Sequence, residues 1–370
     1  MEKDNKTKKE SKFFEEPIEF GKPIVTKGRI FAFPLKSCIR ESNIRRGNCV
    51  SIVWDKKSFI FYGLVIGEES HIFLFDSNST IEDVGKVEVE NAKNGILVFD
   101  GLDNIVCIIT DGSDTTRIFT HNLDTARRMY SHMWGHFTFS PIEYKDILLE
   151  KEIIFAVGKN NFDGLIYFLT NKGNIYTYSI EENKLTYISK VDDKNLSKVI
   201  CFNPENGNVY GVTKDGNFWR LSNKKINYLD IWIPCMKNRN YVACAGNLIW
   251  FENRIFGCTL QDAYLFEYDI EDGKVKNLGR PDENSEIRDI DILEDGRIFG
   301  ITASKDRGMG RIFCYSKERG FEDMGIIQAW QPVHDFAYQP LGIKSGSSGD
   351  FLIGNGENRA NIFLYCSAPF

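Results

Sequence analysis

The sequence repeats one pattern of four short strands, and this repetition limits the fold more than any other feature. Residues 287–325 contain four apolar stretches of strand length, separated by turn-forming residues such as Asp295-Gly296. Such a segment predicts a four-stranded antiparallel meander. The same arrangement recurs in residues 198–231 and in residues 247–279. The chain therefore consists of repeated small sheets of one kind.

The spacing of the repeats identifies the architecture. Each unit has an aromatic residue in its third strand, and successive aromatics are 46, 57, 43, 47, 47 and 50 residues apart. A period in the mid-forties with four strands per unit is typical of a propeller blade. We therefore predict an all-β fold, a seven-bladed β-propeller of four-stranded antiparallel blades. The seven aromatics are Phe73, Phe119, Tyr176, Trp219, Phe266, Phe313 and Phe363.

The two ends of the sequence are predicted to share one blade. The last unit has only three strands, which we expect at "HDFAYQP", "DFLIGN" and "NIFLYCSAPF". Residues 29–35, "RIFAFPL", form a strand before the first unit. If this N-terminal strand completes the seventh blade, the ring closes and the exposed edges of an open sheet disappear. We predict a single propeller domain over residues 21–370, preceded by a flexible tail over residues 1–20.

Glycines in the second strands follow aromatic residues at corresponding positions. A glycine inside a strand marks a place where another part of the protein approaches the backbone closely. We expect these glycines to let adjacent sheets approach one another. They are Gly211, Gly257 and Gly300.

Composition excludes several classes of function. The formal net charge is −6, whereas nucleic-acid binders and proteins that bind anionic membranes usually have basic surfaces. The nine cysteines include no CxxC pair and lie mostly in apolar stretches, which favours buried thiols over disulfides or metal ligands. The N-terminal segment has no apolar signal-peptide region, and no apolar run is long enough to span a membrane. We expect a cytoplasmic protein.

One face of the predicted propeller is rich in cations. The loops that lead into the innermost strands lie on the same face as the loops between second and third strands, and these two sets form the usual binding face. In a net acidic chain, such a set would attract a carboxylate, sulfate or phosphate. The alternative is that these are ordinary polar loops, because they also contain acidic residues. The cationic candidates for substrate binding are Arg45, Lys198, Arg288, Arg307 and Arg359.

A second candidate region is residues 127–150, which contain most of the extra length between the second and third units. Long loops on a rigid scaffold often carry function. Histidine suits proton transfer because its pKa lies near neutrality, and Tyr can act as its partner near cations. The spacing of His132 and His136 lacks the Glu of zinc-protease motifs, so no metal is predicted. Trp134 is either a stacking platform for a sugar or a residue packed between blades. The histidines of this region either face a ligand or belong to ordinary packing.

The blade sequences "GRIFGIT", "LFEYD", "GKVKNLG" and "FLIGNGENRANIFLY" resemble bacterial seven-bladed propellers that include polysaccharide lyases of the ulvan-lyase type. The resemblance covers about residues 29–370. It implies β-elimination beside a uronate, in which cations neutralise the carboxylate and His and Tyr transfer protons. By their positions in the predicted blades, His136 or His334 would be the base, Tyr144 or Tyr241 the acid, and Arg45 with Arg288 the carboxylate clamp.

Three functions fit these observations. The leading one is a lyase-type enzyme that acts on an anionic saccharide or a related small acid at the channel mouth. The second is a non-catalytic propeller that holds a ligand or protein through aromatics such as Trp134, Trp250 and Trp330. The third is a cyclase or isomerase in a small-molecule pathway. The expected partner is a small anionic ligand or oligosaccharide, with a protein as the alternative, and no cofactor, nucleic acid or membrane is predicted.

Overall fold

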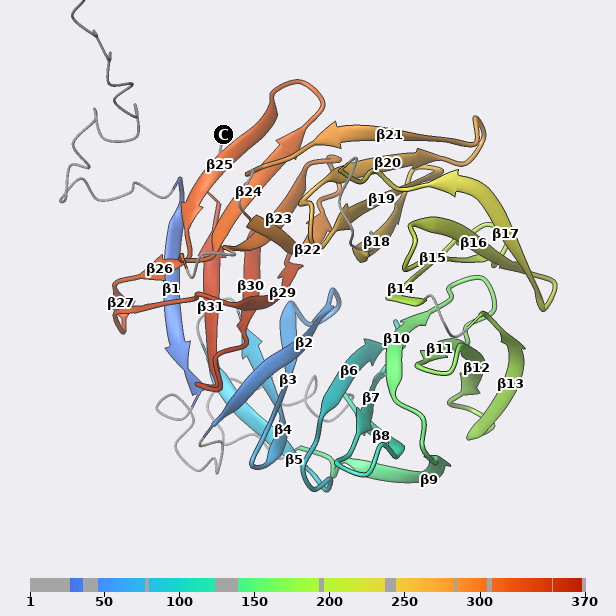
Figure 1. Ribbon diagram of the computed structural model, residues 1–370. Helices are drawn as coiled ribbons and strands as arrows, with labels where there is room; N and C mark the ends of the chain where they lie inside the picture. Colours follow the sequence, from blue (N-terminus) through green and yellow to red (C-terminus); the bar gives the residue numbers. More distant parts are fainter. Residues whose placement is uncertain are drawn as a thin grey trace, which may run out of the picture.

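The chain folds into a ring of seven sheets, as the repeat pattern predicts (Figure 1). This computed structural model describes residues 27–35, 46–76, 80–123, 139–192, 196–236, 244–282, 285–304, 308–347 and 349–367. Six of the sheets have four antiparallel strands in sequence order, and the seventh combines both ends of the described chain. Among the described residues, no helix has the length and hydropathy needed to cross a membrane.

The first three blades follow one another in sequence, beginning with β2. The first blade contains β2 (Gly47–Asp55), β3 (Ile60–Gly67), β4 (Ser70–Asp76) and β5 (Ile81–Val87). The second contains β6 (Asn94–Phe99), β7 (Asn104–Thr110), β8 (Thr116–Asn122) and β9 (Glu143–Leu149). The third contains β10 (Ile154–Lys159), β11 (Ile166–Thr170), β12 (Asn174–Ser179) and β13 (Lys184–Lys190).

The next three blades repeat the same order. The fourth contains β14 (Leu196–Phe202), β15 (Val209–Thr213), β16 (Asn217–Ser222) and β17 (Lys225–Trp232). The fifth contains β18 (Ala245–Phe251), β19 (Arg254–Thr259), β20 (Leu265–Asp269) and β21 (Lys274–Gly279). The sixth contains β22 (Ser285–Ile292), β23 (Ile298–Ser304), β24 (Arg311–Ser316) and β25 (Gly320–Ile326). In each blade the first strand is innermost, because the first strands contact one another around the ring.

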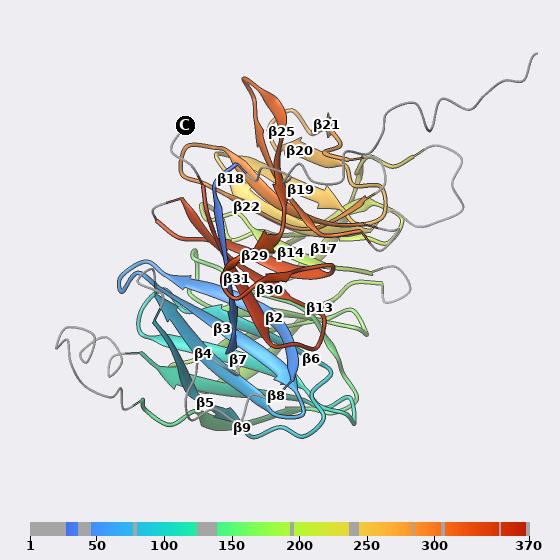
Figure 2. The ribbon, with the colours of Figure 1, turned by 90° about the vertical axis from the view of Figure 1, so that its left-hand side faces the viewer.

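The seventh blade closes the ring with strands from both ends. Its strands are β29 (Pro340–Ser345), β30 (Asp350–Asn355), β31 (Asn361–Cys366) and β1 (Arg29–Pro34). β1 pairs antiparallel with β31 along its whole length, and both ribbon views show the two side by side (Figures 1 and 2). The predicted closure by the N-terminal strand is confirmed.

One strand of the seventh blade was placed wrongly. The prediction put its innermost strand at "HDFAYQP", whereas the innermost strand is β29, "PLGIKS". The segment "HDFAYQP" forms only the two-residue strand β28 (Asp335–Phe336), which pairs with β26 (Gln328–Ala329). Between them, β27 (Gln331–Pro332) pairs in parallel with β1 and adds a fifth strand outside the blade.

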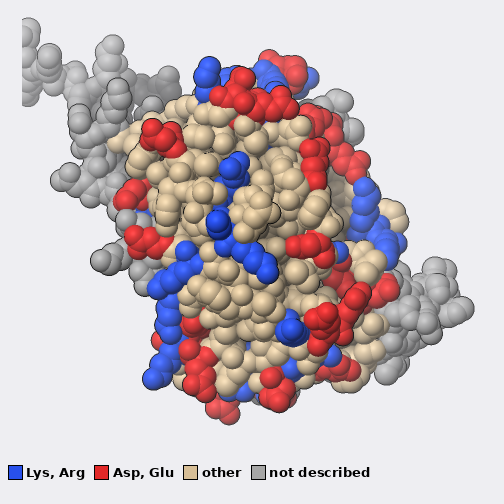
Figure 3. Space-filling view, turned by 90° about the vertical axis from the view of Figure 1, so that its right-hand side faces the viewer, with Lys and Arg blue, Asp and Glu red and all other residues tan. Residues whose placement is uncertain are grey.

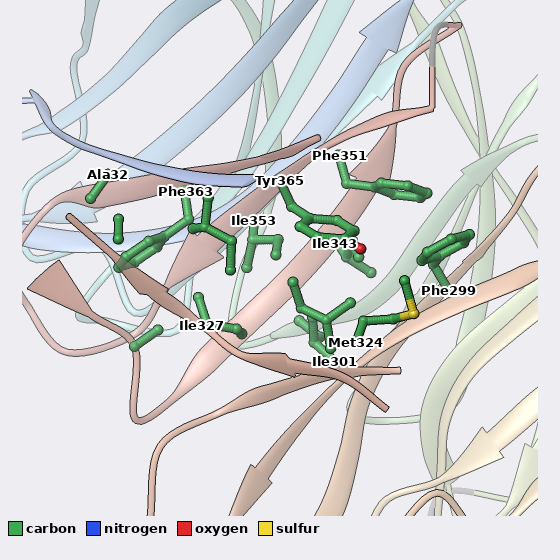
Figure 4. Packing of buried hydrophobic residues seen from close by; sticks show 14 of the residues in the cluster. Ala32, Phe299, Ile301, Met324, Ile327, Ile343, Phe351, Ile353, Phe363 and Tyr365 are labelled. Atoms are coloured by element: carbon green, nitrogen blue, oxygen red, sulfur yellow. The ribbon is translucent and has the colours of Figure 1, made fainter. Parts of the chain in front are cut away.

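The hydrophobic core consists of layers between adjacent blades. Figure 4 shows the layer between the sixth and seventh blades, where Phe299 and Ile301 of β23 lie near Phe351 and Tyr365. The rings of Phe299 and Phe351 are 4.4 Å apart, and all of these side chains are fully buried. Each blade therefore depends on both neighbours for the burial of its two faces. The eight described cysteines are all free thiols and five of them are buried.

The strand glycines have a different role from the one predicted. In four blades the third-strand aromatic pairs directly with a second-strand glycine of the same sheet, as in Gly300↔Phe313 and Gly211↔Trp219. A Cβ at Gly300 would lie 2.3 Å from the Phe313 ring, and one at Gly211 would lie 2.2 Å from the Trp219 ring. These glycines therefore make room for an aromatic ring on the neighbouring strand of the same sheet. The prediction that they let adjacent sheets approach one another was wrong.

Replacing Gly300 by Ala should destabilise the protein by about 1–3 kcal/mol, because the new methyl group overlaps the Phe313 ring. Urea unfolding followed by intrinsic fluorescence measures the loss. The double variant Gly300→Ala/Phe313→Leu should lose less than the sum of the two single variants, because Leu removes the overlapping end of the ring. Simple additivity of the two losses would contradict the pairing described here.

Polar side chains join the innermost strands of neighbouring blades. The Asn247 amide of β18 donates to Asp289 Oδ1 of β22 at 2.5 Å, and Asp289 Oδ2 accepts the backbone N–H of Ile343 in β29 at 2.9 Å. Burial raises the pKa of Asp289 to about 7, against the effect of the Ile343 hydrogen bond. These contacts tie the fifth, sixth and seventh blades together at the channel.

Candidate binding site beside the seventh blade

The structure places some of the predicted site residues and leaves others outside its described part. Lys198, Arg288, Tyr144, His334 and Arg359 are described. Arg45, His132, Trp134, His136, Tyr241 and Arg307 lie outside the described residues.

Lys198 and Arg288 lie near the channel, on the innermost strands β14 and β22. The Lys198 ammonium is 5.0 Å from the centre of the Phe155 ring in the preceding blade. Arg288 Nη2 is 3.1 Å from Glu286 Oε2 on its own strand. Each cation thus has a local partner, and the two residues belong to different blades.

Tyr144 lies far from the innermost strands, on β9 at the outer edge of the second blade. Its ring is 42% exposed and lies 5.4 Å from the Phe119 ring. Since β8 and β9 flank residues 124–138, this segment joins the third strand of the second blade to the fourth. The candidates His132, Trp134 and His136 belong to this segment, which lies outside the described residues.

His334 lies outside the seventh blade, two residues after β27, and not at the start of an innermost strand. Its imidazole stacks on the indole of Trp330, with ring centres 4.2 Å apart and planes at 9°. The amide nitrogen of Gln328 is 3.1 Å from His334 Nε2. Because an amide nitrogen only donates, Nε2 is the acceptor and the proton of the neutral ring is on Nδ1.

The Trp330–His334 pair belongs to residues 328–338, which we call the outer loop. Figure 1 shows its strands β26 and β27 at the margin of the ring, beside β1. Ala329 and Ala337 anchor the loop by burial in the core between the sixth and seventh blades. A second anchor is Asp335, whose carboxylate accepts from Asn361 and lies 3.3 Å from Arg359 Nη1. Arg359 is therefore paired with the outer loop.

Trp330 is the most accessible large apolar side chain among the described residues, with 69% of its surface exposed. One face of the indole is covered by His334, so the opposite face is open to solvent. Beside it is a cavity of about 370 Å³, lined by residues 28–31 of the N-terminal segment and by Gln328, Trp330 and Gln331. A flat ring next to a small cavity can hold an apolar or planar side chain of a partner.

The sequence predicts both Trp330 and Trp250 as aromatic residues that could hold a partner. The structure separates the two, because Trp250 packs at 6.2 Å from Tyr210 between the fourth and fifth blades. The stacked pair of Trp330 and His334 was not foreseen, although the spacing of four residues and the intervening Pro332 were visible in the sequence.

Comparisons with known proteins agree with the fold. No protein-family model matches the sequence, and no curated protein matches it as a relative. The WD40 β-propeller domain of Doa1 is similar with a TM-score of 0.58 and 13% identity, covering 88% of this chain and 94% of that chain. The β-propeller domain of Cps50 (Swd1) from Myceliophteria thermophila has a TM-score of 0.60 and 9% identity, with 89% and 99% covered. These structural neighbours are WD40-type propellers and not lyases, and at such identities the likeness establishes the fold alone.

Proposed function

We propose that this protein is a non-catalytic binding propeller that holds a protein partner, with Trp330 as the central contact. The observation that carries this proposal is the outer loop. It lies outside the four-stranded blades, is anchored at both ends, and presents an indole that is 69% exposed. Ordering such a segment costs conformational entropy, and an ordered segment that exposes a large apolar ring is typical of an interaction site.

The geometry at Trp330 suits recognition of a protein. Tryptophan is among the residues that contribute most to protein–protein interfaces when it fills a pocket at their centre. Stacking on His334 fixes the indole before binding, which lowers the ordering cost of association. The neighbouring cavity of about 370 Å³ can take one side chain of the partner.

The lyase-type function remains the rival hypothesis. It requires an acid and a base that act on one substrate. Among the described candidates, Tyr144 lies on the outer strand of the second blade and His334 lies outside the seventh, with the first blade between them. The WD40-type neighbours support a binding role better than β-elimination on an anionic saccharide.

Trp330→Ala should abolish partner binding while leaving the fold intact. Immobilised wild-type protein, Trp330→Ala and Phe162→Ala are each exposed to an extract of the native cells, and retained proteins are quantified by mass spectrometry. Phe162 is a matched control because it is an exposed aromatic, at 58%, in the third blade. We expect at least one protein to be retained by the wild type and by Phe162→Ala but at least tenfold less by Trp330→Ala, a loss of about 1.4 kcal/mol or more.

Two results would contradict the proposal. One is an identical set of retained proteins for all three samples. The other is turnover of a panel of uronate oligosaccharides, detected by the absorbance of the unsaturated product, that is intact in Trp330→Ala and lost in His334→Ala. The second result would establish the lyase-type function instead.

A further inference from the structure

The outer strands of the third, fourth and fifth blades carry a row of exposed lysines. Lys184, Lys225 and Lys274 are the first residues of β13, β17 and β21, so they occupy equivalent positions on three consecutive blades. Lys276 follows on β21. We call these four residues the lysine strip. All four are exposed.

Among the described residues, no lysine of the strip forms an ion pair, although Glu267 and Asp269 of β20 lie opposite Lys276 and Lys274 in the strand pairing. Within the described ranges, none of its ammonium groups has a carboxylate within 4 Å, whereas acidic residues on other outer strands are paired. Asp83 of β5 lies 3.0 Å from His71, and Glu143 of β9 lies 2.6 Å from Lys145. Figure 3 shows the side with β13, β17 and β21, where Lys and Arg side chains gather near the middle and most acidic side chains lie around them.

Protection of free strand edges does not account for this distribution. Lysines on edge strands hinder unwanted pairing with other chains. That role applies equally to every blade, yet β5, β9 and β25 carry more acidic than basic residues. By contrast, β13, β17 and β21 together contain five lysines and one aspartate. An excess of lysine over acidic residues is therefore found on the outer strands of three consecutive blades.

Exposed aromatic rings accompany the lysines on the same strands. Tyr187 of β13 is 55% exposed and Tyr228 of β17 is 50% exposed. The two tyrosines are equivalent, because each pairs with the third-strand aromatic of its blade. Trp232, at the end of β17, is 52% exposed. Half-exposed rings thus lie on two of the three strands that carry the lysine strip.

From this combination we infer that the lysine strip and its tyrosines bind an acidic, extended segment of a partner protein. This surface lies on different blades from Trp330 and goes beyond the function proposed above. The lysines supply charge complementarity and the rings supply apolar contact, which are the two ingredients of such an interface.

The residue types favour a protein segment over a nucleic acid or a membrane. The three outer strands contain no arginine, although arginine is the residue best suited to phosphate groups. A long polyanion would also be repelled by the whole chain, whose net charge is −6. A short segment with separated carboxylates avoids that repulsion.

The blade geometry sets the spacing of those carboxylates. Packed sheets are about 10 Å apart, and the blades diverge towards the outside. An extended chain advances by at most about 3.3–3.6 Å per residue. In a segment that crosses three outer strands, carboxylates that meet lysines of neighbouring blades must therefore be at least about three positions apart.

The test uses a fluorescein-labelled 15-residue peptide with Glu at every third position and Leu or Ser between, measured by fluorescence anisotropy at low salt. A peptide with Lys in place of Glu, a single-stranded 15-mer DNA and vesicles containing phosphatidylserine are measured in parallel. The triple variant Lys184→Glu/Lys225→Glu/Lys274→Glu should weaken binding of the acidic peptide at least tenfold. The control Lys172→Glu/Lys214→Glu/Lys317→Glu changes the charge equally at exposed lysines elsewhere and should stay within about twofold of the wild type.

Trp330→Ala should also stay within about twofold, so failure of this inference and failure of the proposed function are distinguishable. The inference is overturned if the acidic peptide does not bind, if both triple variants weaken it equally, or if DNA or vesicles bind more tightly than the peptide through the same three lysines.

Discussion

Replacing Phe33 by Ala in the closing strand should cost about 3–5 kcal/mol of stability, the loss expected when a buried Phe side chain is truncated. Phe33 lies on β1, is 6% exposed, and its ring is 5.2 Å from the Phe75 ring of the first blade. It therefore joins the N-terminal strand to both blades that meet at the closure. The midpoint of urea unfolding should fall accordingly, at an unchanged slope.

The matched control for Phe33 is Phe162→Ala, the same chemical change at a ring that is 58% exposed. This variant should unfold within about 0.5 kcal/mol of the wild type. Equal midpoints for Phe33→Ala and Phe162→Ala would mean that β1 does not hold the ring closed.

Removing the imidazole of His121 should change how stability depends on pH. His121 is fully buried on β8, and burial lowers its pKa to about 4, opposed by a hydrogen bond from the imidazole to the backbone of Ser140. The unfolded chain, with a pKa near the usual 6.5, binds the proton more readily. The stability contributed by the neutral ring is therefore complete above about pH 6.5 and is lost as the pH falls towards 4, by about 3 kcal/mol.

The comparison must isolate His121, because Asp289 acts in the opposite direction. Its raised pKa means that its contribution is complete below about pH 3.8 and is lost as the pH rises through about 7. Both His121→Phe and His121→Leu should gain about 3 kcal/mol relative to the wild type between pH 6.5 and pH 4. The two variants should differ in absolute stability and share one slope. A wild-type slope in both would show that His121 does not titrate as described.

Much of the fold could be predicted because its repeat is local. All seven third-strand aromatics lie in third strands, since alternation and turns determine these strands within each unit. The seventh blade was misread at its inner strand for a physical reason. "HDFAYQP" alternates like a strand, but Phe336 and Tyr338 pack edge to face, with ring centres 4.8 Å apart. The true strand β29 has only Leu341 and Ile343 as large apolar residues and therefore gives a weak signal.

The position of the long insertion could not be predicted from spacing alone. Both Phe119 and Tyr176 are third-strand residues, so the excess between them fits any of the intervening connections. The equivalence of Tyr187 and Tyr228 was hidden for a related reason. Irregularities between Ile175 and Tyr176, and between Asn217 and Trp219, shift the pairing of the fourth strands.

Exposure was the least predictable property of the candidate site. Trp330 reads like any other aromatic in an apolar stretch, and such rings are usually buried. Its accessibility follows from the detour of the outer loop around β1, which depends on anchors far away in the sequence, at Asn361 and Arg359.

The shared seventh blade has a consequence for how the protein is made. The hydroxyl of Tyr365 donates to the backbone oxygen of Lys27, 338 positions earlier in the chain. During synthesis β1 leaves the ribosome first, and its partner β31 follows only after six other blades have been translated. Until then the apolar strand "RIFAFP" has no pairing partner. During this interval the nascent chain is exposed to aggregation and to capture by chaperones. The slow step of biogenesis is thus expected at the end of translation, when distant segments meet.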